Sequence, residues 1–451
     1  MHLLRTRLRL TLLLLLCAAV CGCGTPGSSG GAVTARSGPV STGFDTGEKV
    51  SLTMWDDETS PGDSKAQDQL IHEFEQRYPN VTVHRVVKSF DDYMSTIKLA
   101  ASSSNAPDVF QGNEGYAVDQ ALIKAGLILP LDGQAAAYGW DTRFGNPLTL
   151  DPLRWSADGA TWGSGTLWGV AQKAEVLGVF YDKDVMSRLG LRPPRTFAQF
   201  EQTLAKAKAA GVPPVMVGGL DRWPLGHVFM VLQALFEKPS AVSAWAFGHP
   251  GASFDTPGTR KAAEVFAQWG AKGYFENGFN GVSQQTAAAR FAKGEGLYFI
   301  TGPWENQTFA GPLGNRVGFF PMPGTGSAPS AATGSLSLPY HISSRTPHPE
   351  VAAALIDYLT GQHAAKLLIE NGDLPAADPG SAALDGGSSL AAIARTWRQK
   401  SRAGLLVPYL DWATASMGDT LFGGLQQLSQ GATTPAQFTA AVQKDWESAH
   451  S

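Results

Sequence analysis

The chain has very little cysteine and only one long apolar run. Its 451 residues contain three cysteines, Cys17, Cys21 and Cys23, and all three lie in or beside the apolar residues 10–20. This run follows three arginines and is too short to span a bilayer, so residues 1–22 are predicted to be a secretory signal peptide. A mature chain made for an oxidising compartment then has no internal disulfide to form, and packing must stabilise it.

Signatures of several chemistries are also missing. The nine histidines are scattered, and the chain contains no HExxH, GxSxG or GxxxxGK[ST] motif. Metal, acyl-transfer and nucleotide chemistry therefore have no support, and no cofactor is expected. His227 and His341 are interpreted as structural. Removal of residues 1–22 takes away three arginines and changes the formal charge from −4 to −7, and the remaining chain has no basic stripe. Nucleic acid is therefore not an expected partner.

The motif Val20-Cys21-Gly22-Cys23 resembles the lipobox of bacterial lipoproteins, in which the last cysteine is lipidated and becomes the first residue. The resemblance implies an anchor of at least two acyl chains on Cys23, since one chain holds a protein only marginally. Ordinary signal cleavage is the alternative. Residues 24–47 contain seven glycines together with Ser, Thr and Pro. Residues 23–47 are therefore expected to carry the lipid and form a flexible tether that spans about 25–30 Å.

The remaining residues can form more than one core, since single cores stop growing near about 250–300 residues. Strand-like runs at 50–55, 81–87 and 107–111 alternate with helical patterns at 63–78 and 93–101. This alternation predicts an α/β fold with a mainly parallel sheet covered on both faces. Such sheets bind ligands beyond the carboxyl ends of their strands. The residues at these ends are Trp55, Asp56, Glu58, Asn113 and Glu114.

A polar interruption divides two strand-like runs in the middle of the chain. Residues 167–170 and 176–181 are rich in aromatic and branched side chains, whereas residues 172–175 are polar and end with Glu175. Such a break is where a chain crosses from one body to another, although a surface hairpin with a solvated Glu175 is the alternative. A second crossing is expected in residues 311–334, which are rich in Gly, Pro and Ser.

Tryptophans near loop carboxylates and amides suit a carbohydrate. The C–H faces of a sugar ring are weakly apolar and lie on aromatic rings, while its hydroxyls need paired donors and acceptors. Gly302-Pro303 ends a predicted strand, and we expect it to turn the indole of Trp304 out of the sheet end. A core position is the alternative for each tryptophan. The candidate ligand-binding residues are Trp55, Asp56, Glu58, Asn113, Glu114, Glu175, Trp223, Asn280, Trp304, Asp411 and Trp412.

The same carboxylates leave a second class of function open. Asp56, Glu58 or Glu175 would serve a glycosidase as acid and nucleophile if two carboxyl groups lay about 5–10 Å apart. The sequence does not show such a separation. A secreted, lipid-anchored enzyme that acts on glycosides is therefore the alternative to a binding protein.

Several short motifs occur in a specific order from about residue 50 to the end. They include Leu52-Thr-Met-Trp55, Phe74-Glu-Gln-Arg-Tyr-Pro79, Ala106-Pro-Asp-Val109, Phe180-Tyr-Asp-Lys-Asp184, Phe291-Ala-Lys-Gly-Glu-Gly296 and Gly302-Pro-Trp304. In this order they resemble the extracellular solute-binding proteins of bacterial ABC sugar importers, in the oligosaccharide-binding branch that includes maltose-binding protein. Residues 408–412 match maltose-binding protein poorly, so the ligand need not be a maltooligosaccharide.

The resemblance implies a two-lobed fold of the periplasmic-binding-protein type, in which each lobe is a mainly parallel sheet flanked by helices and the ligand cleft lies between them. It implies that Glu175 lies at the cleft and that Trp223 and Trp304 are sugar platforms. Lobe I is expected to comprise residues 48–172 and 320–362, and lobe II residues 173–319 and 363–451.

The expected function follows from this family. The protein is not expected to be an enzyme but a lipid-anchored monomer at the extracytoplasmic face of the bacterial cytoplasmic membrane. It would capture a sugar, in particular an oligosaccharide, and deliver it to the permease of an ABC transporter.

Overall fold

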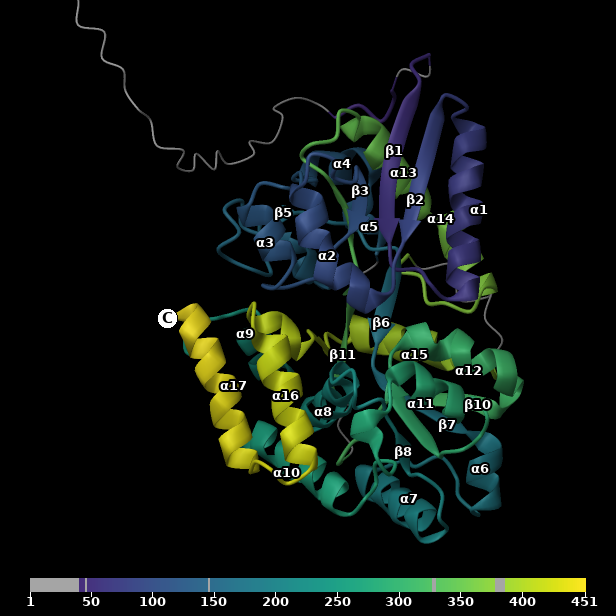
Figure 1. Cartoon of the computed structure of the whole chain (residues 1–451), viewed down its shortest axis with the longest axis vertical. Coiled ribbons are helices and arrows are strands. Elements are labelled where there is room, and N and C mark those ends of the chain that lie inside the picture. Colours follow the sequence, from purple (N-terminus) through teal and green to yellow (C-terminus); the bar gives the residue numbers. More distant parts are fainter. Residues whose placement is uncertain (1–39, 45–46, 145–146, 327–329, 378–385) are drawn as a thin grey trace, which may run out of the picture. The chain divides into compact units, whose positions relative to one another are not determined.

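The computed structural model describes residues 40–44, 47–144, 147–326, 330–377 and 386–451 (Figure 1). The predicted signal peptide, Cys23 and most of the predicted tether lie outside these ranges. Within them, every helix is too short or too polar to cross a membrane.

The first sheet has the strand order β12-β3-β1-β2. Strands β1 (Val50–Asp56), β2 (Val81–Val87) and β3 (Val109–Gln111) run parallel, and β12 (Tyr340–Ile342) pairs antiparallel with β3. This confirms the parallel arrangement predicted for the first three strands. Helices α13 (Pro349–Leu359) and α14 (Gln362–Glu370) pack against α1 (Pro61–Arg77). We call this sheet and its helices the first lobe.

Helix α1 begins earlier than its sequence pattern suggested. The sequence analysis started this helix at Asp63, but the N-cap is Ser60, whose side chain accepts a hydrogen bond from the Asp63 backbone N–H. Pro61 stands in the first turn, where its missing N–H is not needed. Asp63 is thereby free to use its carboxylate elsewhere.

The second sheet has the strand order β10-β7-β9-β8. It is mixed, because β8 (Val215–Met216) and β9 (Tyr298–Thr301) run parallel while β7 (Gly178–Asp182) is antiparallel to β9 and to β10 (Val317–Phe320). We call this sheet and its helices the second lobe.

Two strands cross between the lobes. Strand β6 (Lys173–Val176) leads into β7 of the second lobe, and β11 (Ala332–Ser337) leads from the second lobe to β12 of the first. They pair antiparallel with each other, and β13 (Leu406–Val407) pairs with β11 (Figure 1). The sequence analysis read residues 172–175 as a polar break, but Lys173–Val176 is itself a strand. Ala174 and Val176 are buried on one side, and the polar side chains alternate with them.

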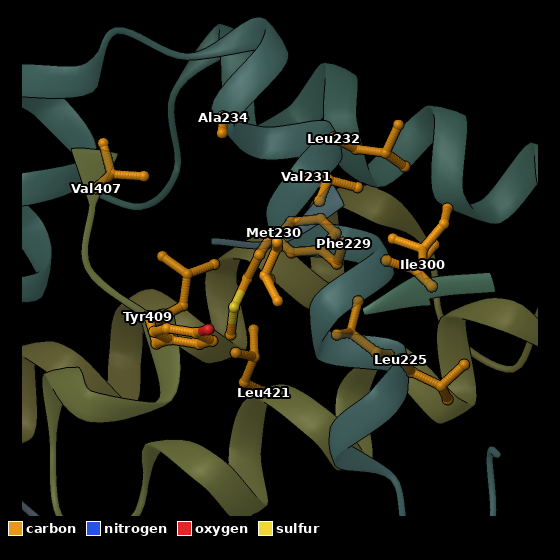
Figure 2. Packing of buried hydrophobic residues seen from close by; sticks show 14 of the residues in the cluster. Leu225, Phe229, Met230, Val231, Leu232, Ala234, Ile300, Val407, Tyr409 and Leu421 are labelled. Atoms are coloured by element: carbon orange, nitrogen blue, oxygen red, sulfur yellow. The ribbon is translucent and has the colours of Figure 1, made fainter. Parts of the chain in front are cut away.

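Helix α8 (Trp223–Phe236) forms much of the core of the second lobe. Its residues from Pro224 to Ala234 are all buried, as expected for a helix that is apolar on every side. Figure 2 shows Leu225, Phe229 and Met230 of α8 among Ile300 of β9 and Leu421 of α16 (Met417–Ser429). This packing fixes the first turn of α8, where Trp223 lies.

Threonine caps hold several of the other helices. Thr196 caps α7 (Phe197–Ala209), Thr256 caps α10 (Pro257–Ala271), and Thr434 forms a capping box with Gln437 at the start of α17. The remaining elements are α2 (Phe90–Ser102), α3 (Asp119–Lys124), α4 (Asp132–Tyr138), α5 (Trp140–Arg143), η1 (Pro147–Leu153), β4 (Arg154–Trp155), β5 (Thr166–Leu167), α6 (Lys183–Arg188), α9 (Pro239–Ala246), η2 (Phe279–Gly281), α11 (Gln284–Phe291), η3 (Pro303–Glu305), α12 (Asn306–Leu313), η4 (Gly314–Arg316), α15 (Ser389–Arg402), η6 (Leu410–Ala413) and α17 (Pro435–His450).

Candidate ligand-binding site

Glu175 lies on the polar side of the crossing strands. Ser337 of β11 donates a hydrogen bond to Glu175 Oε1, and the Tyr409 hydroxyl donates to Glu175 Oε2 over 3.1 Å. Burial raises the pKa of the Glu175 carboxyl, while the two hydrogen bonds oppose the rise. The alternation of β6 therefore points this carboxyl into a set of polar and aromatic groups, and Glu175 is not a solvated hairpin residue.

Three large aromatic side chains surround His227, and a fourth contacts one of these three. The His227 ring centroid lies 5.0 Å from that of Trp223, 5.2 Å from Trp304 and 6.0 Å from Tyr409. The Tyr409 ring in turn lies 4.7 Å from Trp412. The structure thus brings together three of the predicted tryptophans, from α8, η3 and η6. We call Trp223, Trp304, Tyr409 and Trp412 the aromatic group.

Trp304 is held differently from the way the sequence suggested. Gly302-Pro303 was expected to turn the indole out of the sheet end, but the backbone of Gly302 is not what requires a glycine, since its φ is −97°, which any residue adopts. Glycine is needed instead because the indole folds back over it: a Cβ on Gly302 would lie 1.9 Å from Trp304 Cζ3. The half-buried indole packs against the buried hydrophobic cluster that includes the residues of α8.

Two of the predicted ligand carboxylates already have partners. Asp56 is fully buried, and its two oxygens each accept a hydrogen bond of 2.6 Å from the Arg85 guanidinium. Glu58 accepts from Gln111 over 3.0 Å and forms an ion pair with Lys173. Asp56 is the last residue of β1 and Glu58 follows it, at the carboxyl end of the strand as predicted, and both fix the shape of the loop there. Asp57 between them is more exposed.

Lys173 is the centre of a buried ionic cluster beside β6. Besides Glu58, its Nζ lies 3.1 Å from Asp373 Oδ2 and 3.7 Å from Asp63 Oδ2. Burial raises the pKa of the Asp373 carboxyl to about 8, although Lys173 opposes the rise. Gln307 of α12 donates to Asp63 Oδ1 over 2.6 Å. The cluster therefore links a crossing strand to α1 of the first lobe and, through Gln307, to α12 of the second.

Glu114, which follows β3 of the first lobe, lies next to the aromatic group. It is almost fully buried, its Oε1 accepts a hydrogen bond of 3.3 Å from Ser335, and its Oε2 has no partner among the described residues. The next turn is attached to the C-terminal segment, since the Tyr116 N–H donates to Trp412 O over 2.9 Å. Burial raises the pKa of Glu114 well above its usual range, so this carboxyl is suited to donate as well as accept.

The other candidates occupy separate surroundings. The Asn113 N–H donates to Asp119 Oδ1 over 3.2 Å, and Asn280 packs against the backbone of Gly219, with its buried Oδ1 unpaired among the described residues. The Lys88 ammonium lies 4.9 Å from the centre of the half-buried Trp55 ring.

The rims of the two lobes also meet. The Phe90 ring of α2 lies 6.5 Å from that of Trp223. Phe90 is 38% exposed, and Leu220, which precedes α8, is 55% exposed. Arg222, which lies between Leu220 and the start of α8, has a backbone φ of 64°, a strained value for a residue with a Cβ. Such strain often marks a functional loop, and here it sets the direction of Trp223.

A cavity of about 220 Å³ lies along the outer edge of the crossing strands. Its lining combines β11 and β13 with parts of η1, α9 and α15, including Ser335, Leu406 and Trp397. Ser335 therefore lies between this cavity and Glu114. Within the described ranges, no cluster of three or more His, Cys, Asp or Glu side chains is arranged to hold a metal ion.

Sequence reasoning missed His227, Tyr409, Ser335, Ser337 and Lys173. His227 had a readable signal, because it follows Trp223 by four residues on a helix and so shares its face. The serines became relevant only once the register placed Ser335 opposite Glu175.

Asp411 provides a test of how dry this region is. Burial raises the pKa of its carboxyl to about 7. The folded chain therefore keeps this proton up to about pH 7, whereas the unfolded chain loses it near about pH 3.9, so stability from Asp411 is lost as the pH rises between these values. We expect Asp411→Asn to gain about 1–3 kcal/mol relative to wild type between pH 4 and pH 8. Urea denaturation across this range measures the gain.

Asp419→Asn is the matched control, since the Asp419 side chain is 85% exposed. Its stability should stay within about 1 kcal/mol of wild type, because an exposed surface pair contributes little. A constant difference for Asp411→Asn would contradict the raised pKa.

The chain belongs to the family of bacterial extracellular solute-binding proteins, whose model matches residues 57–366, more than half of its length. A multiple sugar-binding protein of Streptococcus mutans is 23% identical over 304 residues, which are 65% of this chain and 67% of that one. A probable sugar-binding periplasmic protein of Mesorhizobium japonicum is 28% identical over 223 residues, 49% of each chain. The chain thus spans only about half to two thirds of the length of these relatives.

Solved structures share the fold. A chitin oligosaccharide binding protein superposes with a TM-score of 0.76 at 20% identity, covering 89% of this chain and 99% of that one. The solute-binding protein RafE in complex with raffinose superposes with a TM-score of 0.70 at 19% identity, covering 89% and 100%. The predicted two-lobed α/β fold and the family resemblance are therefore confirmed. The prediction of a mainly parallel sheet in each lobe was wrong for the second lobe, because β7 pairs antiparallel with both of its neighbours.

Proposed function

We propose that the protein captures a sugar, in particular an oligosaccharide, between its lobes and delivers it to the permease of an ABC transporter. The observation that carries the proposal is the aromatic group beside Glu175, whose oxygens are held by Ser337 and Tyr409. The names of the relatives support it, since both are described as sugar-binding. The protein would act as a monomer and do no chemistry on its ligand.

The chemistry of the site fits a saccharide. Indole rings offer flat apolar faces to the C–H surface of a sugar, and each such contact excludes water from it. The hydroxyls at the edge of the sugar ring need both hydrogen-bond donors and hydrogen-bond acceptors as partners. Glu175 and Glu114 supply acceptors, and protonated carboxyls, whose pKa burial raises, supply donors.

Closure would follow from contacts that only a bound ligand completes. The crossing strands β6 and β11 join the lobes, and a hinge at their ends changes the distance between the two rims. The Phe90–Trp223 contact and the hydrogen bond from Gln307 to Asp63 already span the lobes. A sugar that touches both sides favours the closed arrangement only by its additional contacts there.

A panel of mono- and oligosaccharides, screened for thermal stabilisation, tests this function. A ligand present at a hundred times its dissociation constant adds about 2.7 kcal/mol to the stability. We expect at least one neutral saccharide to raise the melting temperature with no release of new reducing ends. Stabilisation by a peptide or metal alone would refute the sugar assignment, and sustained release of reducing ends would show a glycosidase instead.

We further propose that diacylation of Cys23 anchors the protein at the extracytoplasmic face of the cytoplasmic membrane. We expect Cys23→Ala to release a folded protein that still binds its ligand, because the glycine-rich tether separates the anchor from the body. Fractionation of cells into membrane and soluble parts measures this. Retention of the variant in the membrane fraction would contradict the lipid anchor.

A further inference from the structure

His227 lies between two aromatic rings of the site. It follows Trp223 by one helical turn on α8, so the two side chains share one face of the helix. The ring of Trp304, from η3, lies 5.2 Å away on another side. An imidazole in this position is next to any sugar face that rests on these indoles.

The ring of His227 is buried with an unsatisfied nitrogen. The residue is 7% exposed, and its Nδ1 has no hydrogen-bond partner among the described residues. The indole Nε1 of Trp223 is likewise buried and unpaired within the described part of the chain. Buried polar groups are normally paired, so two adjacent exceptions indicate a partner that binds from outside the chain.

His341 shows what a structural histidine looks like in this protein. Its Nδ1 is bonded to Trp168 O over 2.7 Å, and its Nε2 lies 3.1 Å from Asp119 Oδ1. Both nitrogens are satisfied, as the sequence analysis expected for a structural residue. His227 was interpreted in the same way, but its surroundings differ from those of His341.

The charge state of His227 is fixed by its surroundings. Burial lowers its pKa to about 3, so the imidazole is neutral at physiological pH. A neutral imidazole carries one donor and one acceptor, which matches a sugar hydroxyl pair. The groups that face it are Trp223 on its own helix, Trp304, and Tyr409, whose hydroxyl donates to Glu175.

We infer that His227 contacts the bound sugar and supplies a donor and an acceptor to its hydroxyls between the rings of Trp223 and Trp304. The inference rests on the proposed function and narrows its ligand to uncharged saccharides. Burial raises the pKa of Tyr409, and three nearby carboxyl groups, Glu175, Glu114 and Asp411, raise it further. A carboxylate or phosphate group on the ligand would lose its hydration beside these carboxyls and raise their pKa values further, so uronates and sugar phosphates should bind more weakly than neutral saccharides.

The test uses a neutral saccharide that stabilises the wild type in the panel. Calorimetric titration of the purified mature protein should give an affinity about 10- to 100-fold lower for His227→Phe, which keeps a ring but no hydrogen bond. His227→Gln keeps a donor and an acceptor and should lose less. The uronate counterpart of the saccharide should bind the wild type at least about 10-fold more weakly.

Stability separates this role from a structural one. Without ligand, His227→Phe should melt no lower than wild type, because the substitution removes an unpaired polar group from an apolar site. A structural role predicts the opposite, with a lower melting temperature and unchanged affinity. His227→Leu, which is smaller, makes the same comparison if phenylalanine displaces the neighbouring indoles.

Monodeoxy versions of the ligand identify the contact. A deoxy sugar that binds the wild type about 10-fold more weakly should bind His227→Phe with little additional loss, since the two changes remove one interaction. If, for every monodeoxy sugar, the affinity loss from the missing hydroxyl and the loss from His227→Phe add in full, the inference is overturned. If wild type and His227→Phe bind saccharides equally tightly, the role of His227 is overturned while the proposed function stands. If the wild type binds no saccharide, the proposed function is overturned as well.

Discussion

Lys173→Met should destabilise the protein by about 3–5 kcal/mol, because it leaves Glu58, Asp63 and Asp373 buried together without their cation. The side chains of these carboxylates are 3%, 6% and 4% exposed, so water replaces little of the lost charge. Urea denaturation at pH 8 measures the loss.

The loss should also depend on pH with a definite sign. Lys173 lowers the pKa of Glu58 and of Asp373, against the effect of burial. Without Lys173 these folded-state pKa values rise further, so stability is present at low pH and is lost as the pH increases. The deficit of Lys173→Met should therefore be smaller at pH 5 than at pH 8.

Lys261→Met is the matched control. Lys261 is 51% exposed and lies 3.3 Å from the exposed Glu264 on the same helix. Its loss should be within about 1 kcal/mol and nearly independent of pH, as for other surface pairs. Equal losses for the two variants would show that the buried cluster contributes nothing special.

Trp304→Ala should weaken sugar binding by about 1–3 kcal/mol, the range that aromatic stacking supplies with nucleic-acid bases. The indole is half-buried and adjoins His227, so part of its surface faces the site and part packs on the core. The stability loss should accordingly fall below the about 3–5 kcal/mol of a fully buried tryptophan. Calorimetry and denaturation on this variant measure both quantities.

Gly302→Ala tests whether the position of the Trp304 indole matters, because it keeps the ring but displaces it. The new methyl would clash with Trp304 Cζ3, whereas the backbone of Gly302 accepts alanine without strain. We expect the affinity to fall as the indole is displaced. Gly311→Ala, with open space around its Cβ, is the control. An unchanged affinity in Gly302→Ala would remove Trp304 from the site.

Much of the first lobe could be predicted from the sequence because its signals are local. Each signal extends over only a few residues. These signals are the period-two pattern of residues 50–55, the helix stop at Pro79 and the return to β-type residues at 81–87. The position of Asp56 at the carboxyl end of β1 was predicted for the same reason. Its pairing with Arg85 was not, because that contact joins residues 29 apart on neighbouring strands.

The site itself depended on longer-range information. Residues 172–175 look like a loop because Lys173 and Glu175 are charged. The partners of these two side chains come from segments far away in the sequence, such as Asp373 for Lys173 and Tyr409 for Glu175. Similarly, Gly302 has an ordinary backbone, and the reason for glycine lies in the ring that covers it. Neither contact has a signature in a single sequence.

The burial of α8 has a consequence for how ligand preference can change in this protein or be redesigned. Trp223 and His227 stand on the first turns of a helix whose every side is packed, so neither can shift to suit a wider ligand without disturbing the interior. Tyr409 and Trp412 belong instead to the short segment between β13 and α16. Tyr409 and Trp412 are each only 5% exposed, so this segment is packed as closely as α8, and a change of ligand size on either side of the site requires compensating changes in the core.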